Sequence, residues 1–227
     1  MRSTLAHLLL LALGALAAAP ALGREPFTTV PRPEVDIDPR TFEVLKRDSG
    51  PINYYSFVED REGGYLHADY KPGYKTTVLA YALPENHRRD VARVRWRWRA
   101  EALPAGGNEC QSGKTDSAAV VYLTWKRGLR WYALKYVWSS VGPRGAVCDQ
   151  KRNPFVAQDT VILESGGPLN EWRTVDLDPD EEFRKHFAGG DPRANVPDFG
   201  GIGIMSDGDQ TGSESSADYG GFEITYR

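Results

Sequence analysis

The chain has 227 residues, a formal net charge of −3 and a hydrophobic content of 41%. This acidic balance lacks the basic surface typical of nucleic-acid-binding proteins, so no nucleic-acid partner is expected. Beyond the N-terminal segment, no apolar run approaches the length of about 20 residues that a membrane-spanning helix needs.

Residues 1–21 are predicted to be a secretory signal peptide. Arg2 precedes an apolar run from Leu8 to Ala19, and Ala19-Pro20-Ala21 offers a cleavage site. An uncleaved membrane anchor is the alternative, but the run is short for a span of about 20 residues. We therefore expect an exported protein, periplasmic or extracellular, with no membrane span after cleavage.

Residues 22–40 are predicted to form an extended arm. Prolines recur at Pro26, Pro31, Pro33 and Pro39, and the segment has little periodicity. The remainder, residues 41–227, has a suitable size for a single all-β domain.

Short β-type segments follow the arm, separated by glycine and proline turn signals such as Gly63-Gly64 and Lys71-Pro72-Gly73. The first segments are expected at residues 41–45, 53–58, 65–70 and 76–82. A strand spacing of roughly ten residues is typical of a sandwich. We predict an antiparallel β-sandwich of jelly-roll type.

Residues 91–100 give the clearest strand, because Val94, Trp96 and Trp98 alternate with arginines. The two tryptophans are expected to face a core. The arginines of the other face, Arg93 to Arg99, allow two interpretations. They either grip an acidic polymer such as a uronate or form an outward face paired with Asp and Glu of neighbouring strands. Charged rows on strands are usually solvated, which favours the second interpretation.

Residues 118–125 and 131–138 are predicted to form a hairpin across Lys126-Arg127-Gly128. One face of its second strand carries Tyr132, Tyr136 and Trp138. Such a row is either core or a platform on which sugar rings stack.

Further strands are expected at residues 155–164, 171–177, 199–205 and 219–226. The one convincing helix is expected near 179–187. Asp178 suits the N-cap and Pro179 the first helical position. The acidic residues that follow complement the helix dipole.

The two cysteines of an exported chain, Cys110 and Cys148, favour a disulfide bond. Both lie in polar, glycine-rich connections. Two free thiols are the alternative, and a metal site is less favoured because no histidine lies near either cysteine.

An acidic stretch from Asp207 to Asp218 separates the last two expected strands. Oxygen-bearing side chains recur with the rhythm of a calcium-binding loop, at Asp207, Asp209, Thr211, Ser213, Ser215 and Asp218, with Gly212 at the sixth position. Thr and Ser replace acids, however, and the composition equally suits a turn bonded to its own backbone. Calcium is the one cofactor that the sequence suggests.

No G-x-S-x-G, H-E-x-x-H or phosphate-binding glycine loop is present, and the histidines of the mature chain are scattered. A lone His67 gives no triad. Paired carboxylates of a glycosidase can arise anywhere in a chain this acidic.

Several motifs occur in an order and spacing that resemble the bacterial domain-of-unknown-function family numbered 3047, from about Thr41 to the C-terminus. They are Trp96-Arg97-Trp98, Asp116 ahead of Val121-Tyr122, Leu134-Lys135-Tyr136-Val137-Trp138, Val161 to Gly166 ahead of Trp172, and Ile204 to Thr211 ahead of Tyr219-Gly220. The resemblance implies an exported bacterial protein with a jelly-roll-like sandwich similar to carbohydrate-binding modules. It implies no catalytic residues.

The function predicted from the sequence is non-catalytic binding of a glycan or another cell-envelope ligand, since sugar faces stack on aromatic side chains in concave sites. The alternative is a polysaccharide hydrolase or lyase with a carboxylate pair. The expected ligand contacts are Tyr136, Trp138, Trp172, Arg173, Asp116, Asp207, Asp209 and Thr211.

Overall fold

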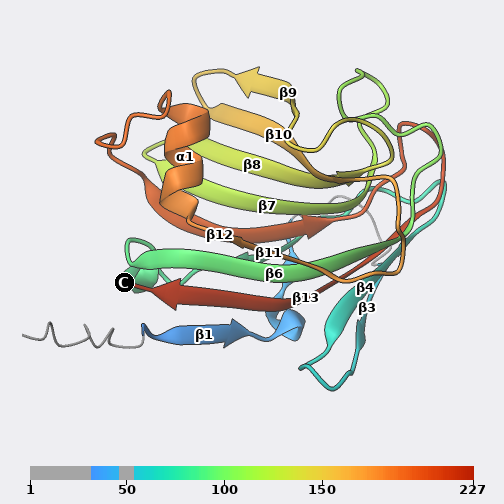
Figure 1. The fold of residues 1–227 in the computed structure, drawn as a ribbon, viewed down its shortest axis with the longest axis horizontal. Helices are drawn as coiled ribbons and strands as arrows, with labels where there is room; N and C mark the ends of the chain where they lie inside the picture. The colour runs from blue at the N-terminus through green and yellow to red at the C-terminus, as the bar shows by residue number, and fades with distance from the viewer. Residues whose placement is uncertain (1–31, 46–53) are drawn as a thin grey trace, which may run out of the picture. The chain divides into compact units, whose positions relative to one another are not determined.

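The computed structural model describes residues 32–45 and 54–227, so the predicted signal peptide lies outside the described residues. From Arg32 onward the chain forms one unit built of two β-sheets (Figure 1). The predicted all-β sandwich with one short helix is confirmed. In the described part of the chain, no helix is both long and apolar enough to cross a membrane.

The first sheet has six strands in the order β11-β6-β13-β4-β3, with β1 also paired to β13. Its strands are β1 (Glu34–Ile37), β3 (Tyr55–Val58), β4 (Tyr65–Tyr70), β6 (Val91–Ala102), β11 (Arg173–Leu177) and β13 (Ser215–Tyr226).

The second sheet has seven strands in the order β2-β5-β12-β7-β8-β10-β9. Its strands are β2 (Glu43–Val44), β5 (Leu79–Ala82), β7 (Ser117–Arg127), β8 (Arg130–Ser139), β9 (Val147–Arg152), β10 (Val156–Ser165) and β12 (Asp198–Met205). Among the described residues, 3₁₀ helices at Pro39–Thr41 and Glu85–His87 lie in connections.

The core between the sheets is built from large rings of β6 and β8. Trp96 and Trp98 are fully buried, and Tyr136 and Trp138 are 1% exposed. The ring centroids of Trp96 and Tyr136 lie 5.9 Å apart, and those of Trp98 and Trp138 6.0 Å apart. Because strand side chains alternate, this packing directs the intervening residues of both strands away from the core.

One strand pair of the seven-stranded sheet is parallel. β10 pairs in parallel with β8 and antiparallel with β9. The β9–β10 hairpin folds back so that β10 lies between β8 and β9. The sequence did not predict β9, because Val147–Arg152 is polar and exposed apart from Cys148.

Of the arm predicted at residues 22–40, residues 22–31 lie outside the described residues, and the part from Arg32 onward contains an edge strand. Glu34–Ile37 pairs with β13 from Glu34 opposite Thr225 to Ile37 opposite Phe222. Only Ile37 of this strand is buried, so the segment shows no clear alternation in the sequence. Its strand character comes from backbone pairing rather than from its side chains.

The helix α1 (Pro179–Phe187) confirms its prediction. The Asp178 side chain accepts hydrogen bonds from the backbone N–H groups of Asp180 and Glu181, as an N-cap does. Phe183 is buried, and its ring packs against Trp125 and Tyr132 at centroid distances of 5.6 and 5.0 Å.

The acidic turn before β13 is shorter than predicted, because the strand begins at Ser215 rather than at Tyr219. Pairing with β4 extends to Ser215 opposite Tyr70. Ser215 and Asp218 therefore belong to the strand and not to the turn.

The predicted disulfide between Cys110 and Cys148 is present. The disulfide joins the loop that precedes β7 to strand β9. β9 lies at the edge of the sheet, where it pairs with β10. The cross-link closes a loop with a sequence separation of 38 residues.

Replacing both cysteines, Cys110→Ser with Cys148→Ser, should lower the free energy of unfolding by about 4 kcal/mol, because the uncrosslinked unfolded chain gains conformational entropy. Urea denaturation of the variant and of the oxidised wild type measures the difference. Wild-type protein unfolded in dithiothreitol should match the variant. Equal midpoints for oxidised wild type and variant would contradict the prediction.

Candidate functional site

Two of the predicted ligand contacts are core residues. Tyr136 and Trp138 are each 1% exposed. The Tyr136 hydroxyl donates a hydrogen bond to Glu182 Oε2 at 2.7 Å, and Trp138 Nε1 donates to the Gly166 carbonyl oxygen at 2.8 Å. The aromatic row of β8 is therefore core and not a stacking platform, because its face meets the other sheet.

Trp172 and Arg173 lie with the six-stranded sheet, away from the acidic turn. The Trp172 ring is covered by the guanidinium groups of Arg97 and Arg99, at 4.4 and 4.9 Å from its centroid. Arg173 pairs with Glu171 at 2.9 Å. Trp172 thus contacts two guanidinium groups, and Arg173 forms an ion pair with a residue two positions away.

The arginine row of β6 is paired with acids, as the second interpretation predicted. The partners come from neighbouring strands and from the β3–β4 turn: Arg93 with Asp176, Arg95 with Glu223, Arg97 with Asp60 and Glu62, and Arg99 with Asp218. On the outer face of this sheet, carboxylates thus neutralise the positive charges of these arginines. The face therefore attracts an acidic polymer only weakly.

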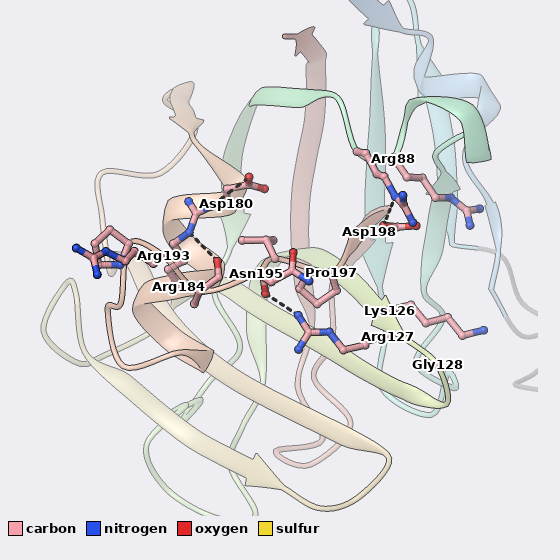
Figure 2. A pocket seen from close by; sticks show the side chains of 14 residues that line it. Arg88, Lys126, Arg127, Gly128, Asp180, Arg184, Arg193, Asn195, Pro197 and Asp198 are labelled. Carbon is pink, nitrogen blue, oxygen red and sulfur yellow. Dashed lines mark hydrogen bonds and ion pairs between the residues drawn. The ribbon is translucent and has the colours of Figure 1, made fainter.

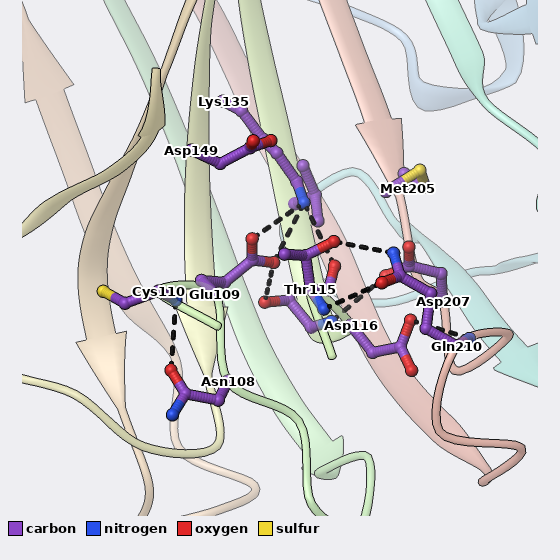
Figure 3. A network of polar contacts seen from close by, with 12 residues as sticks. Asn108, Glu109, Cys110, Thr115, Asp116, Lys135, Asp149, Met205, Asp207 and Gln210 are labelled. Atoms are coloured by element: carbon purple, nitrogen blue, oxygen red, sulfur yellow. Dashed lines mark hydrogen bonds and ion pairs between the residues drawn. The ribbon is translucent and has the colours of Figure 1, made fainter. Parts of the chain in front are cut away.

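Asp116 fixes the turn between β12 and β13 (Figure 3). This fully buried carboxylate accepts hydrogen bonds from Thr211 N and Thr211 Oγ1, both at 2.7 Å, and from Gln210 N at 3.3 Å. The Gln210 side chain also bonds to Thr115 at its hydroxyl and its backbone N–H. These hydrogen bonds therefore fix the positions of Asp116 and Thr211, which are 95 positions apart in the sequence.

The predicted calcium ligands do not form one group. Oxygen atoms of Asp116, Asp207 and Asp209 lie within 4.8 Å of one another. Asp218 instead lies with His67 and Glu101 on the six-stranded sheet, where it bonds to His67 Nδ1 at 2.8 Å and to Arg99 Nε at 2.6 Å. Thr211 and Ser213 bond to each other through their hydroxyl groups at 2.6 Å. The predicted ligand set is wrong in its inclusion of Asp218, because that residue belongs to β13 and its side chain bonds to His67 and Arg99.

A buried ion pair lies beside this acidic group (Figure 3). Lys135 Nζ donates to both carboxylate oxygens of Glu109, at 2.9 and 3.1 Å. Glu109 also accepts a hydrogen bond from Ser117 Oγ at 2.6 Å. Burial raises the pKa of Asp207 to about 7, and the charges of Asp116 and Glu109 add to the rise, while Lys135 and the Ser117 N–H oppose it. Asp207 is consequently half protonated near neutral pH.

A trough on the outer face of the seven-stranded sheet offers a binding surface. Its volume is 350 Å³. Small residues of three strands form its floor, namely Ala80 in β5, Gly201 and Gly203 in β12, and Ala133 in β8, which β7 separates from β12. Tyr122 and Trp131 line it as aromatic walls. Trp131 is 44% exposed, an unusual position for the largest apolar side chain.

The two glycines of β12 have different roles: the backbone geometry requires Gly201, whereas Gly203 leaves space beside Tyr122. Gly201 has φ +144°, and a Cβ there would collide with the Tyr81 carbonyl oxygen. A Cβ on Gly203 would meet Tyr122 at an ordinary contact distance of 3.4 Å and would project into the trough. The floor is therefore largely backbone, with only the methyl groups of Ala80 and Ala133 added, which keeps the hollow open.

The trough residues were not predicted as ligand contacts. Trp131, Ala133 and Lys135 share the other face of β8, and the sequence did not decide that this face is external. The signal that would have found them is the polar Lys135 in an otherwise apolar strand, which marks the outward side. Tyr122 was concealed because β7 is apolar on both faces.

Comparison with known protein families assigns the chain to one of them. The family model described as "Protein of unknown function (DUF3047)" matches residues 42–223. The chain belongs to this family. No curated protein matches it.

Several solved structures are similar in fold to the chain. The family 11 carbohydrate-binding module of the Clostridium thermocellum cellulase Lic26A-Cel5E is 9% identical, with a TM-score of 0.37, and the match covers 82% of this chain and 95% of that one. Trichoderma harzianum endoglucanase 3 of family GH12 is 10% identical (TM-score 0.44; 86% and 98% covered). The family 12 xyloglucanase of Bacillus licheniformis is 6% identical (TM-score 0.46; 87% and 98% covered).

The raised pKa of Asp207 predicts a pH-dependent stability. The folded chain holds a proton on this carboxyl up to pH near 7, whereas the unfolded chain releases it near 3.8, so its stabilising contribution is complete below 3.8 and is lost as pH rises to about 7. Asparagine carries no titratable proton, so the Asp207→Asn variant lacks this loss. As pH rises from 4 to 8, the unfolding free energy of Asp207→Asn minus that of wild type should therefore increase by up to about 4 kcal/mol.

Urea denaturation across this pH range measures the difference for Asp207→Asn. The exposed Asp191→Asn is the matched control and should follow wild type at every pH. A constant difference between Asp207→Asn and wild type would show that Asp207 titrates alike in both states.

Proposed function

We propose that this protein is a glycan-binding module and that the trough of the seven-stranded sheet is its binding site. The observation that carries the proposal is an apolar hollow with a backbone floor and the half-exposed ring of Trp131 at its side. A pyranose ring has apolar faces formed by its C–H groups, and these stack on aromatic rings in preformed concave sites.

The trough also holds polar groups that suit sugar hydroxyls. Gln158 and Thr124 lie among its lining residues. The Thr124 hydroxyl donates to the Gly201 carbonyl oxygen at 3.2 Å and keeps acceptor capacity for a ligand. A few polar groups in a mostly apolar hollow fix the orientation of a ligand, while the rings supply contact area.

Binding is favoured over hydrolysis or lysis by the residues that line the trough. None of them carries a carboxylate within the described ranges 32–45 and 54–227. A glycosidase acts through two carboxyl groups about 5 to 9.5 Å apart across the scissile bond. The neighbouring Glu109 is buried and bonded to Lys135 and Ser117. A polysaccharide hydrolase or lyase would therefore need carboxylates outside the trough.

We also propose that the protein is exported. The proposal is supported by the signal-peptide pattern of residues 1–21 and by the disulfide between Cys110 and Cys148, since stable disulfides belong to oxidising compartments.

Trp131→Ala should weaken glycan binding by at least about 10-fold, because a central aromatic anchor commonly contributes 2 kcal/mol or more. Affinity electrophoresis in gels that contain hydroxyethylcellulose, xyloglucan, xylan or polygalacturonate provides the measurement. Wild type should be retarded by at least one polymer. Gly203→Val should also remove the retardation, because its side chain fills the trough.

Trp172→Ala is the matched control, because it removes an equal ring from the other sheet and so tests the sequence-based contact. It should be retarded as wild type is, and melting temperatures should show that every variant is folded. Absence of retardation by all four polymers, or retardation that survives both Trp131→Ala and Gly203→Val, would refute the proposed function.

A further inference from the structure

A second hollow, of 770 Å³, adjoins the end of β7 and the start of β12 (Figure 2). Six cationic side chains line it, against two carboxylates: Arg88, Arg89, Lys126, Arg127, Arg184 and Arg193 against Asp180 and Asp198. We call it the basic cleft. Its charge is notable because the whole chain carries a net charge of −3.

The basic cleft is built by the segment that follows α1. Gly189 and Gly190, at φ 63° and 78°, turn the chain back after the helix. Arg184 of the helix then holds the returning segment through the Ala194 carbonyl oxygen at 3.3 Å, and Arg127 holds it through the Asn195 carbonyl oxygen at 2.5 Å. Figure 2 shows Arg193 on one side of the hollow, Arg88 and Lys126 on the other, and Arg127 between them.

The carboxylates of the basic cleft are already neutralised. Asp198 pairs with Arg89 at 2.9 Å, and Asp180 pairs with Arg227 at 2.7 Å and with Arg184 at 3.6 Å. Lys126, Arg127 and Arg193 are exposed and take part in no ion pair within the described part of the chain. This contrasts with the arginine row of β6, whose members are all paired with acids.

Lys126 connects the basic cleft to the trough. Its ammonium group lies 4.9 Å from the centroid of the Trp131 ring, a cation–π contact between one lining residue of each hollow. On β12, Asp198 lines the basic cleft and Gly200, two residues later, lines the trough. A single extended ligand that stacks on Trp131 would therefore pass Lys126 into the basic cleft.

We propose that the glycan bound by this protein is anionic, with its acidic groups held in the basic cleft by Lys126, Arg127 and Arg193 while its rings lie in the trough. This inference rests on the proposed function and names the substrate class of that site. Guanidinium groups match carboxylate, sulfate and phosphate oxygens with paired hydrogen bonds. Cations gathered in a cleft also concentrate an oppositely charged ligand there.

Matched pairs of polymers test the charge of the ligand, since each pair keeps the backbone and changes the acidic group. The pairs are carboxymethylcellulose with hydroxyethylcellulose, polygalacturonate with its methyl ester, and dextran sulfate with dextran. We expect the acidic member of at least one pair to bind at least about 10-fold more tightly than its neutral partner, with an advantage that falls as salt rises and screens the charges. The three pairs separate carboxylate from sulfate recognition and one backbone from another.

The double variant Arg127→Gln with Arg193→Gln should remove this advantage, so that it binds the acidic and the neutral member of a pair alike. Arg95→Gln removes one positive charge from the outer face of the other sheet, where Arg95 is 51% exposed, and should behave as wild type. Trp131→Ala should weaken binding of both members of a pair, because it acts on the rings and not on the acidic groups.

The outcomes separate the two proposals. Equal binding of the acidic and neutral members, sensitive to Trp131→Ala, would overturn the anionic ligand and leave the glycan-binding function standing. An acidic advantage that the double variant retains would overturn the role of the basic cleft. Binding of acidic polymers alone, lost in the double variant but unchanged in Trp131→Ala, would overturn the trough as the binding site. Absence of any binding would overturn both.

Discussion

The packing of Trp96 and Trp98 against Tyr136 and Trp138 is the constraint on which the rest of the structure depends. These rings fill the space between the two sheets. Strand side chains alternate between faces, so once this face of β8 is internal, Trp131, Ala133 and Lys135 must be external. A slip of one residue in β8 would turn Lys135 in between the sheets and its core rings outward, and the same slip in β6 would bury the arginine row.

The two outer faces of the sandwich consequently differ in chemistry. The six-stranded sheet presents cations whose charges are compensated by acids of adjacent strands. The seven-stranded sheet presents small residues beside Tyr122 and Trp131, and its hollow remains open because its floor is largely backbone. Among the described residues, the open hollow with aromatic sides thus lies on the seven-stranded sheet, and the rings of Trp96, Trp98, Tyr136 and Trp138 lie in the core.

The trough lies between two charged regions that differ in whether their charges are paired. At one end, Lys135 and Glu109 form a buried pair next to Asp207, where every group has a fixed partner. At the other end, Lys126, Arg127 and Arg193 are exposed and have no acidic partner among the described residues. Buried networks of the first kind make a surface rigid, whereas exposed cations of the second kind attract ligands. This asymmetry gives the surface a direction along which an acidic chain can lie.

The sequence by itself determined the all-β class, α1 with its Asp178 cap and the Cys110–Cys148 disulfide. These follow from local period-two alternation, from a cap within one turn of its helix and from the presence of a single pair of cysteines. Only the tertiary structure decided which face of β8 is internal, since both faces carry aromatic rings. It alone joined Asp116 to Thr211 and placed Asp218 beside His67. Such contacts depend on strand register across long sequence separations, and a local pattern contains no information about that register.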